Sequence, residues 1–156
     1  MKNVKYIIMS ALFILAPALK AEMKLSPFET DGCTMFIDGP PGQPELWRHC
    51  CVEHDLRYWF GGSVEDMDKT DLRLKECVQK DAGVTWATLV YNGVRAGHHS
   101  PIKNKTQWGW AWIPKREKAP LTSIETAFVL ASLKNINEPS VNMEEFLKFY
   151  FPTISN

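Results

Sequence analysis

The sequence predicts a mainly α-helical fold built on a disulfide-linked antiparallel pair of helices. The chain has 156 residues, of which 45% are hydrophobic, so it is long and apolar enough for one core. Two helical stretches, near residues 45–60 and 64–80, are separated only by Gly61, Gly62 and Ser63. So short a connection makes the two helices antiparallel neighbours. The four cysteines lie in and just before these stretches, where they can link them.

Residues 1–21 have the layout of a secretory signal peptide. Lys2 and Lys5 precede an apolar run over residues 6–16, and small residues follow at possible cleavage points after Ala18 or Ala21. The run is short for a membrane span. We therefore expect a secreted or periplasmic protein with a single domain over residues 22–156. Cleavage would remove three lysines and no acid, so the formal charge falls from 0 to −3. That balance argues against a nucleic-acid-binding protein, which would carry a basic patch.

The first helix of the pair is expected to begin near Pro44, a residue suited to a first turn, and to end before Gly61. Ser63 and Asp66 resemble a capping box that opens the second helix. Met67, Leu74 and Val78 then form the apolar stripe of that helix, which runs to about Lys80.

His54 and Asp71 are predicted to face each other across the pair. His54 lies seven residues before Gly61 and Asp71 lies eight residues after Ser63, so both sit at a similar distance from the connection. Asp71 also falls on the apolar stripe, between Met67 and Leu74, and a buried carboxylate needs a partner. His54 is the partner that the register supplies.

An even number of cysteines in an exported chain of this size indicates two disulfides. Cys50 and Cys51 are adjacent and poorly placed to bond each other. Cys50 shares the helix face of His54 and points toward the second helix, so we predict a bond to Cys77. Cys51 shares the face of Asp55 and is left with Cys33. The second bond would draw the loop at residues 32–42 alongside Asp55.

Further elements are predicted from periodicity and capping signals. A third helix is expected over residues 85–96, with Trp86, Leu89, Val90 and Val94 on its apolar side. An aromatic loop with three tryptophans follows over residues 98–112. Two more helices are expected over residues 122–134, from a capping box, and 142–149.

The pairing of His54 with Asp71 suits a general base, because the carboxylate fixes the tautomer of the imidazole and supports its charge. No Gly-x-Ser-x-Gly motif supplies a nucleophile and the cysteines are expected in disulfides, so the base is expected to activate water. Asp55 and carbonyl oxygens of the Cys33 loop are suited to Ca²⁺, which would hold a developing oxyanion.

The pattern Cys50-Cys51-x-x-His54-Asp55 with Tyr58, followed by Asp71 and Cys77, resembles secreted phospholipase A2 and its bacterial relatives over residues 31–80. The resemblance implies cleavage of the sn-2 ester of glycerophospholipids at a phospholipid membrane surface. It implies His54 as the general base, Asp71 as its orienting partner, Tyr58 as support for Asp71 and Asp55 as the calcium carboxylate.

The same resemblance assigns the remaining calcium ligands to the loop, as carbonyl oxygens within residues 32–36, at Gly32, Thr34 and Phe36, and the side chain of Asp38. Two departures stand out. Arg57 occupies a position where many members of the family have a cysteine, and the loop lacks the dense glycines that are usual there.

Four alternatives accompany these expectations. The chain is either the esterase or a non-catalytic exported module that binds lipid or protein on the same scaffold. The vicinal cysteines with His49, His54, His98 and His99 would alternatively make a zinc site, although the usual paired spacings are missing. The tryptophans at 108, 110 and 112 suit either core anchors or a collar among lipid headgroups, and residues 35–37 suit either core or the mouth of an acyl-chain channel.

Overall fold

The computed structural model describes residues 22–98 and 107–153. Within them the chain forms five helices and two short strands, and the model is mainly α, as predicted. The elements in order are β1 Lys24–Leu25, α1 Arg48–Phe60, α2 Val64–Ala82, α3 Val84–Gly97, β2 Trp112–Ile113, α4 Ser123–Leu133 and α5 Met143–Tyr150. The predicted signal peptide, residues 1–21, lies outside the described residues. Residues 99–106 of the predicted aromatic loop also lie outside them.

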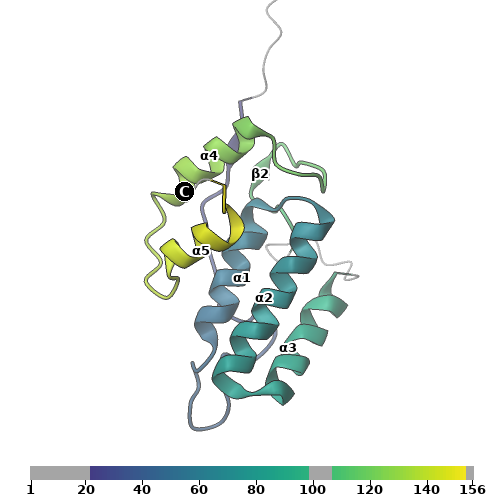
Figure 1. Cartoon of the computed structure of the whole chain (residues 1–156), viewed down its shortest axis with the longest axis vertical. Helices are drawn as coiled ribbons and strands as arrows, with labels where there is room; N and C mark the ends of the chain where they lie inside the picture. Colours follow the sequence, from purple (N-terminus) through teal and green to yellow (C-terminus); the bar gives the residue numbers. More distant parts are fainter. Residues whose placement is uncertain (1–21, 99–106, 154–156) are drawn as a thin grey trace, which may run out of the picture.

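Helices α1, α2 and α3 lie side by side, with α2 in the middle, while α4 and α5 cover one end of α1 (Figure 1). The α1–α2 connection is the predicted three-residue turn, and Ser63 and Asp66 form the predicted capping box. The disulfide between Cys50 and Cys77 joins the two helices. The disulfide-linked antiparallel pair is therefore confirmed.

Helix α1 begins at Arg48, later than the predicted start near Pro44. The residues before it form turns, because the backbone N–H of Trp47 donates to the carbonyl of Asp38 and its indole N–H donates to that of Ile37. Trp47 is fully buried, so these bonds hold the preceding loop against the helix instead of extending the helix. The burial of Trp47 therefore decides where α1 begins, although Pro44 is suited to a first helical turn.

The segment after residue 106 caps the carboxyl end of α1. The last carbonyls of a helix have no partner within the helix. Here the backbone N–H of Gly109 donates to the carbonyl oxygen of Tyr58 at 2.7 Å. The indole N–H of Trp108 donates to the carbonyl of Gly62 at 2.9 Å, and that of Trp112 donates to the carbonyl of Phe60 at 2.7 Å. Trp108 and Trp112 are buried, so they are core anchors, and a lipid collar made of these two rings is not supported.

Two clusters make up most of the core. One lies between the carboxyl-terminal half of α1 and helices α4 and α5, around Leu56, Phe60 and Phe146. The other lies among the loop before α1, α2 and α3, around Trp47, both disulfides and Val90. The predicted capping box of α4 and the Asn142 cap of α5 are present, so both helices begin where predicted. Leu89, predicted on the buried side of α3, is half exposed, because Ala87 and Val90 face α2 instead.

Two features were not predicted from the sequence. The strands β1 and β2 pair antiparallel, with Leu25 opposite Trp112, and join the amino-terminal segment to the loop that caps α1. Arg57 is buried and its guanidinium lies over the rings of Phe60, Trp108 and Tyr150. Burial lowers the pKa of Arg57 to about 10, so it stays charged at neutral pH.

None of the helices in the described part of the chain is both long and apolar enough to cross a membrane.

Candidate functional site

The predicted pair of His54 and Asp71 is formed. The Nε2 atom of His54 lies 3.0 Å from the Oδ1 atom of Asp71, and both side chains are buried. A carboxylate only accepts hydrogen bonds, so Nε2 carries the hydrogen and donates it. The neutral imidazole then has its acceptor at Nδ1, on the side where Asp55 lies. The arrangement leaves Nδ1 as the basic atom.

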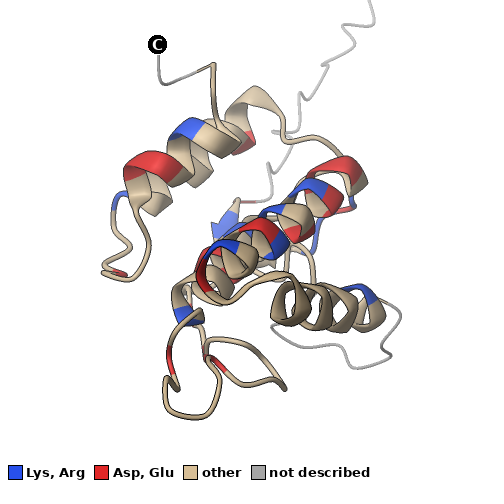
Figure 2. Ribbon diagram, turned by 60° about the horizontal axis from the view of Figure 1, so that its bottom comes forward, with Lys and Arg blue, Asp and Glu red and all other residues tan. Residues whose placement is uncertain are grey.

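Asp71 is fully buried and is surrounded by donors. Tyr58 donates its hydroxyl to Oδ1 at 2.7 Å, which is the support that the resemblance implied. Two further groups come from the end of α3, where Arg95 Nη1 lies 3.2 Å and His98 Nε2 lies 3.1 Å from Oδ2. Arg95 is the single charged residue of α3 and also pairs with Asp68. In Figure 2, α3 is accordingly tan apart from its blue carboxyl-terminal turn.

Neither Arg95 nor His98 was assigned to this site from the sequence. Arg95 lies in the last turn of a helix, where a basic residue also suits the helix dipole, so its presence there carried no specific signal. Their contacts depend on how α3 packs on α2, which the spacing of residues within each helix does not give. Only the tertiary arrangement brings these donors to Asp71.

The pKa values of the pair shift in opposite directions. Burial alone would lower the pKa of His54, but hydrogen bonds and the charges of Asp55 and Asp71 outweigh it and raise that pKa. Burial alone would raise the pKa of Asp71, but the hydrogen bond and the charge of His54, with Tyr58 and His98, lower it. Both shifts favour an imidazolium beside a carboxylate, which is the state that a general base reaches after it takes a proton.

His54 and Asp55 open into a cavity of about 380 Å³. Its walls come from the Cys33 loop and from α2 and α3 and are largely apolar, with Met35, Phe36, Leu74, Val90 and Val94 among them. Tyr58 and His98 also reach this cavity. A larger cavity, of about 1150 Å³, lies between residues 22–30 and 135–138 and has neither histidine nor cysteine among its lining residues. The smaller cavity is therefore the candidate site.

Both predicted disulfides are present. Cys33 bonds to Cys51 and Cys50 bonds to Cys77, so the assignment of helix faces is confirmed. The Cys33–Cys51 bond holds the loop beside Asp55, and residues 32–36 line the same cavity as that carboxylate. Residues 35–37 are exposed, Met35 by 91%, so they are not core, and Met35 and Phe36 lie at the rim of the cavity.

The carboxylates proposed for calcium have different surroundings. Asp55 accepts a hydrogen bond from the hydroxyl of Thr30 at 2.7 Å and lies on the cavity wall. Asp38 accepts from the backbone N–H of Cys33 at 2.6 Å and pairs with Arg48 at 2.8 Å. Asp38 therefore holds the loop in place, and the positive charge beside it is already that of Arg48. The cavity brings Gly32, Thr34 and Phe36 together with Asp55, and Asp38 does not line it.

Comparison of the chain with protein-family models, with curated proteins and with solved structures found no match. The functional interpretation consequently depends on the site itself.

Proposed function

We propose that the chain is an exported, calcium-dependent esterase of the phospholipase A2 type, which hydrolyses the sn-2 acyl ester of glycerophospholipids. The observation that carries the proposal is the orientation of His54: its Nε2 is fixed by buried Asp71, while its Nδ1 is on the Asp55 side at the largely apolar cavity. A base held in one tautomer beside an apolar channel suits water attack on an ester with a long acyl chain.

In the proposed reaction, Nδ1 of His54 takes a proton from a water molecule, and the water oxygen attacks the ester carbonyl carbon. The bond to the glycerol oxygen then breaks, and the proton on His54 passes to that leaving oxygen. The products are a fatty acid and a lysophospholipid. Asp71 stabilises the imidazolium between the two proton transfers, and Tyr58, Arg95 and His98 keep Asp71 charged.

Calcium bound by Asp55 and by carbonyl oxygens of Gly32, Thr34 and Phe36 would supply positive charge for the phosphate and the oxyanion. The fit has two supports: an acidic side chain at the cavity wall, and a loop fastened beside it by a disulfide. Because Asp38 is engaged by Arg48 and Cys33, we base the proposed ligand set on Asp55 and the loop carbonyls.

Met35 and Phe36 are exposed and line the cavity, and Ile37 beside them is also exposed. These apolar residues suit contact with a phospholipid surface, from which a lipid would enter the cavity. With the predicted signal peptide and the two disulfides, this contact fits a secreted or periplasmic enzyme that works on membranes.

A fatty-acid release assay on mixed phospholipid vesicles tests the proposal. Release is expected with calcium and is expected to stop with a chelator. His54→Ala should abolish it, while Glu53→Gln, a neighbour on α1 that pairs with Arg73 away from the cavity, should keep it. If wild-type protein binds the vesicles but releases no fatty acid, the non-catalytic binding module is the better reading.

A further inference from the structure

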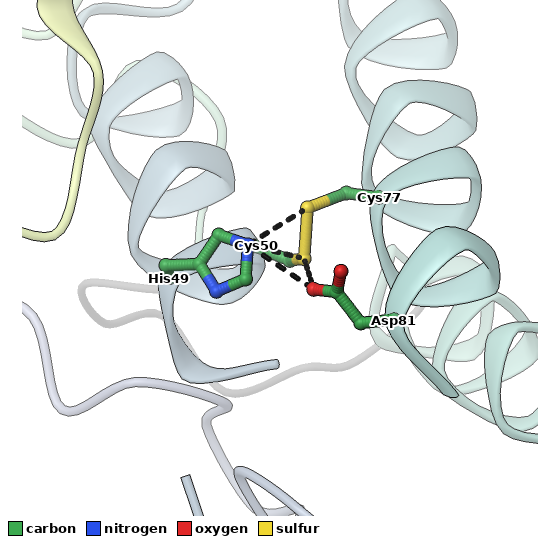
Figure 3. A group of neighbouring side chains, drawn as sticks. All are labelled: His49, Cys50, Cys77 and Asp81. Carbon is green, nitrogen blue, oxygen red and sulfur yellow. Dashed lines mark hydrogen bonds and ion pairs between the residues drawn. A yellow bond between two sulfur atoms is a disulfide. The ribbon is translucent and has the colours of Figure 1, made fainter. Parts of the chain in front are cut away.

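A second group of reactive side chains lies outside the cavity, toward the end of the helix pair that is away from the connection at residues 61–63. His49 and Cys50 belong to the first turn of α1, and Cys77 and Asp81 belong to the last turns of α2. Figure 3 shows the His49 ring and the Asp81 carboxylate turned toward the Cys50–Cys77 disulfide. We refer to these four residues as the His49 cluster. None of them lines the candidate site.

The distances in the His49 cluster are short. The Nε2 atom of His49 lies 3.2 Å from Oδ2 of Asp81, 3.5 Å from Sγ of Cys50 and 3.6 Å from Sγ of Cys77. One ligand atom can be chosen from each of the four residues so that all four atoms lie within 4.8 Å of one another. A plain disulfide between two helices needs neither an imidazole nor a carboxylate at its sulfur atoms.

Two sulfurs, an imidazole nitrogen and a carboxylate oxygen form a complete tetrahedral donor set for zinc, which binds these atoms at roughly 2.0–2.3 Å. Cys77 and Asp81 are one helical turn apart and so share a face of α2, a spacing that suits two ligands of one ion. The oxidised sulfurs are bonded to each other and are poor ligands, because zinc binds thiolate. The donor set can therefore bind zinc only after the disulfide is reduced.

We propose that the His49 cluster is a latent zinc site, which forms when the Cys50–Cys77 disulfide is reduced. A dithiol or phosphine reductant supplies two electrons, the S–S bond breaks, and each sulfur takes a proton. A dithiol becomes a disulfide, whereas a phosphine becomes a phosphine oxide with an oxygen from water. Zn²⁺ then displaces the two thiol protons to the solvent and is bound by Cys50, Cys77, His49 and Asp81.

The surroundings allow both steps. The side chains of His49 and Asp81 are 44% and 23% exposed, so an ion and a small reductant can reach them from solvent. The second disulfide offers a natural comparison, because it groups with one carboxylate, Asp38, and the resulting group has only three donors. Asp38 is also bonded to Arg48 and to the N–H of Cys33. The two disulfides should consequently respond differently to zinc.

In the reduced protein, zinc therefore replaces the disulfide as the link between α1 and α2. Cys50 and Cys77 connect the beginning of α1 to the end of α2 in either state, first by a covalent bond and then through the ion. The site thus keeps the helix pair closed under reducing conditions, toward the end of the pair that lies away from the connection at residues 61–63.

Differential alkylation of the full chain provides the first test. The protein is reduced with a phosphine, supplied with one equivalent of Zn²⁺ or with a chelator, and alkylated with iodoacetamide before peptide mass spectrometry. We expect zinc to slow labelling of Cys50 and Cys77 at least about tenfold, as for thiolates held by a metal, and to leave Cys33 and Cys51 labelled as with chelator. No zinc-dependent protection of Cys50 and Cys77, or equal protection of all four cysteines, would overturn the proposal.

Variants give the second test, with cobalt as a coloured substitute for zinc. Reduced wild-type protein should show sulfur-to-cobalt charge-transfer absorption and the visible bands of a tetrahedral ion. His49→Ala and Asp81→Asn should each weaken zinc affinity about 10- to 100-fold in a chelator competition, while Glu76→Gln, an exposed neighbour of Cys77, should not. Each variant is first shown by circular dichroism to fold in its oxidised form. Unchanged zinc affinity in folded His49→Ala protein would contradict the assignment.

Discussion

His54 on α1 and Asp71 on α2 meet across the helix pair with 3.0 Å between Nε2 and Oδ1, and neither side chain has more than 8% of its surface exposed. The remaining hydrogen-bonding capacity of Asp71 is taken by groups from α1 and α3. One buried carboxylate therefore links three helices, so changes at this residue should affect both the stability and the proposed chemistry.

Asp71→Asn should lower the free energy of unfolding by roughly 2–4 kcal/mol, because it removes a buried charge on which His54, Arg95 and His98 depend. Asp68→Asn is the matched control. Asp68 lies on the same helix and also pairs with Arg95, but it is 48% exposed, so its loss should cost about 0–1 kcal/mol. Urea unfolding of both variants measures the difference, and equal losses would show that burial of Asp71 is not what matters.

The pKa of His54 should lie above its ordinary value of 6.5 in calcium-free buffer. Asp55→Asn should bring it down, because the hydrogen bond and charge of Asp55 are among the influences that raise it. Nuclear magnetic resonance titration of the imidazole signals measures both values. A higher pKa in the variant than in wild type would contradict the arrangement.

The same shift sets how stability depends on pH. A raised pKa in the folded state stabilises the fold below pH 6.5, and this contribution is lost as the pH rises through the raised value. The difference in unfolding free energy between wild type and His54→Gln should therefore shrink above pH 6.5. His98 contributes with the opposite sign, because burial lowers its pKa, and taking the difference between the two proteins removes that contribution.

Asp55→Lys should abolish calcium binding while α1 remains folded, because the ammonium would occupy the place of the cation and Lys is well tolerated in helices. Isothermal calorimetry of wild type and variant is the measurement. Thr30→Ala should weaken binding only modestly, since Thr30 orients the carboxylate without being a ligand. Indistinguishable titrations of wild type and Asp55→Lys would remove Asp55 from the site.

Gly93 lines the cavity on α3, and a Cβ atom built on it meets nothing within 4 Å. Gly93→Ala should raise the unfolding free energy by about 0.5–1 kcal/mol, because alanine favours a helix. Gly93→Phe should fill part of the cavity and reduce kcat/KM about tenfold or more for long acyl chains, with a smaller effect on short ones. Equal losses for both chain lengths would place the acyl chain elsewhere.

Gly61→Ala should destabilise the protein by roughly 2–4 kcal/mol. Gly61 has φ of 63°, and an added Cβ would lie 2.7 Å from the backbone of Gly109, where the capping loop crosses the end of α1. Gly42→Ala is the control, since Gly42 has φ of 91° but open space around it, and it should cost only about 1 kcal/mol. Thermal unfolding compares them, and similar losses would mean that the close approach is unimportant.

The sequence by itself determined the helix pair, its capping box, both disulfides and the meeting of His54 with Asp71. Each of these follows from spacing along one or two neighbouring helices, where 3.6 residues per turn fix which side chains share a face. The later start of α1 was missed because Trp47 is buried against the preceding loop, and helix periodicity does not report this contact with a residue ten positions earlier.

The tertiary structure alone decided what surrounds that pair. The placement of Arg95 and His98 at Asp71, of Trp108 and Trp112 at the end of α1, and of His49 beside the Cys50–Cys77 disulfide depends on how separate segments pack. Periodicity reports which face of an element is apolar, but it does not report which element covers that face. Donors that reach a site from another helix, or from a loop 46 or 52 residues away in the sequence, leave no local pattern, and packing alone brings them together.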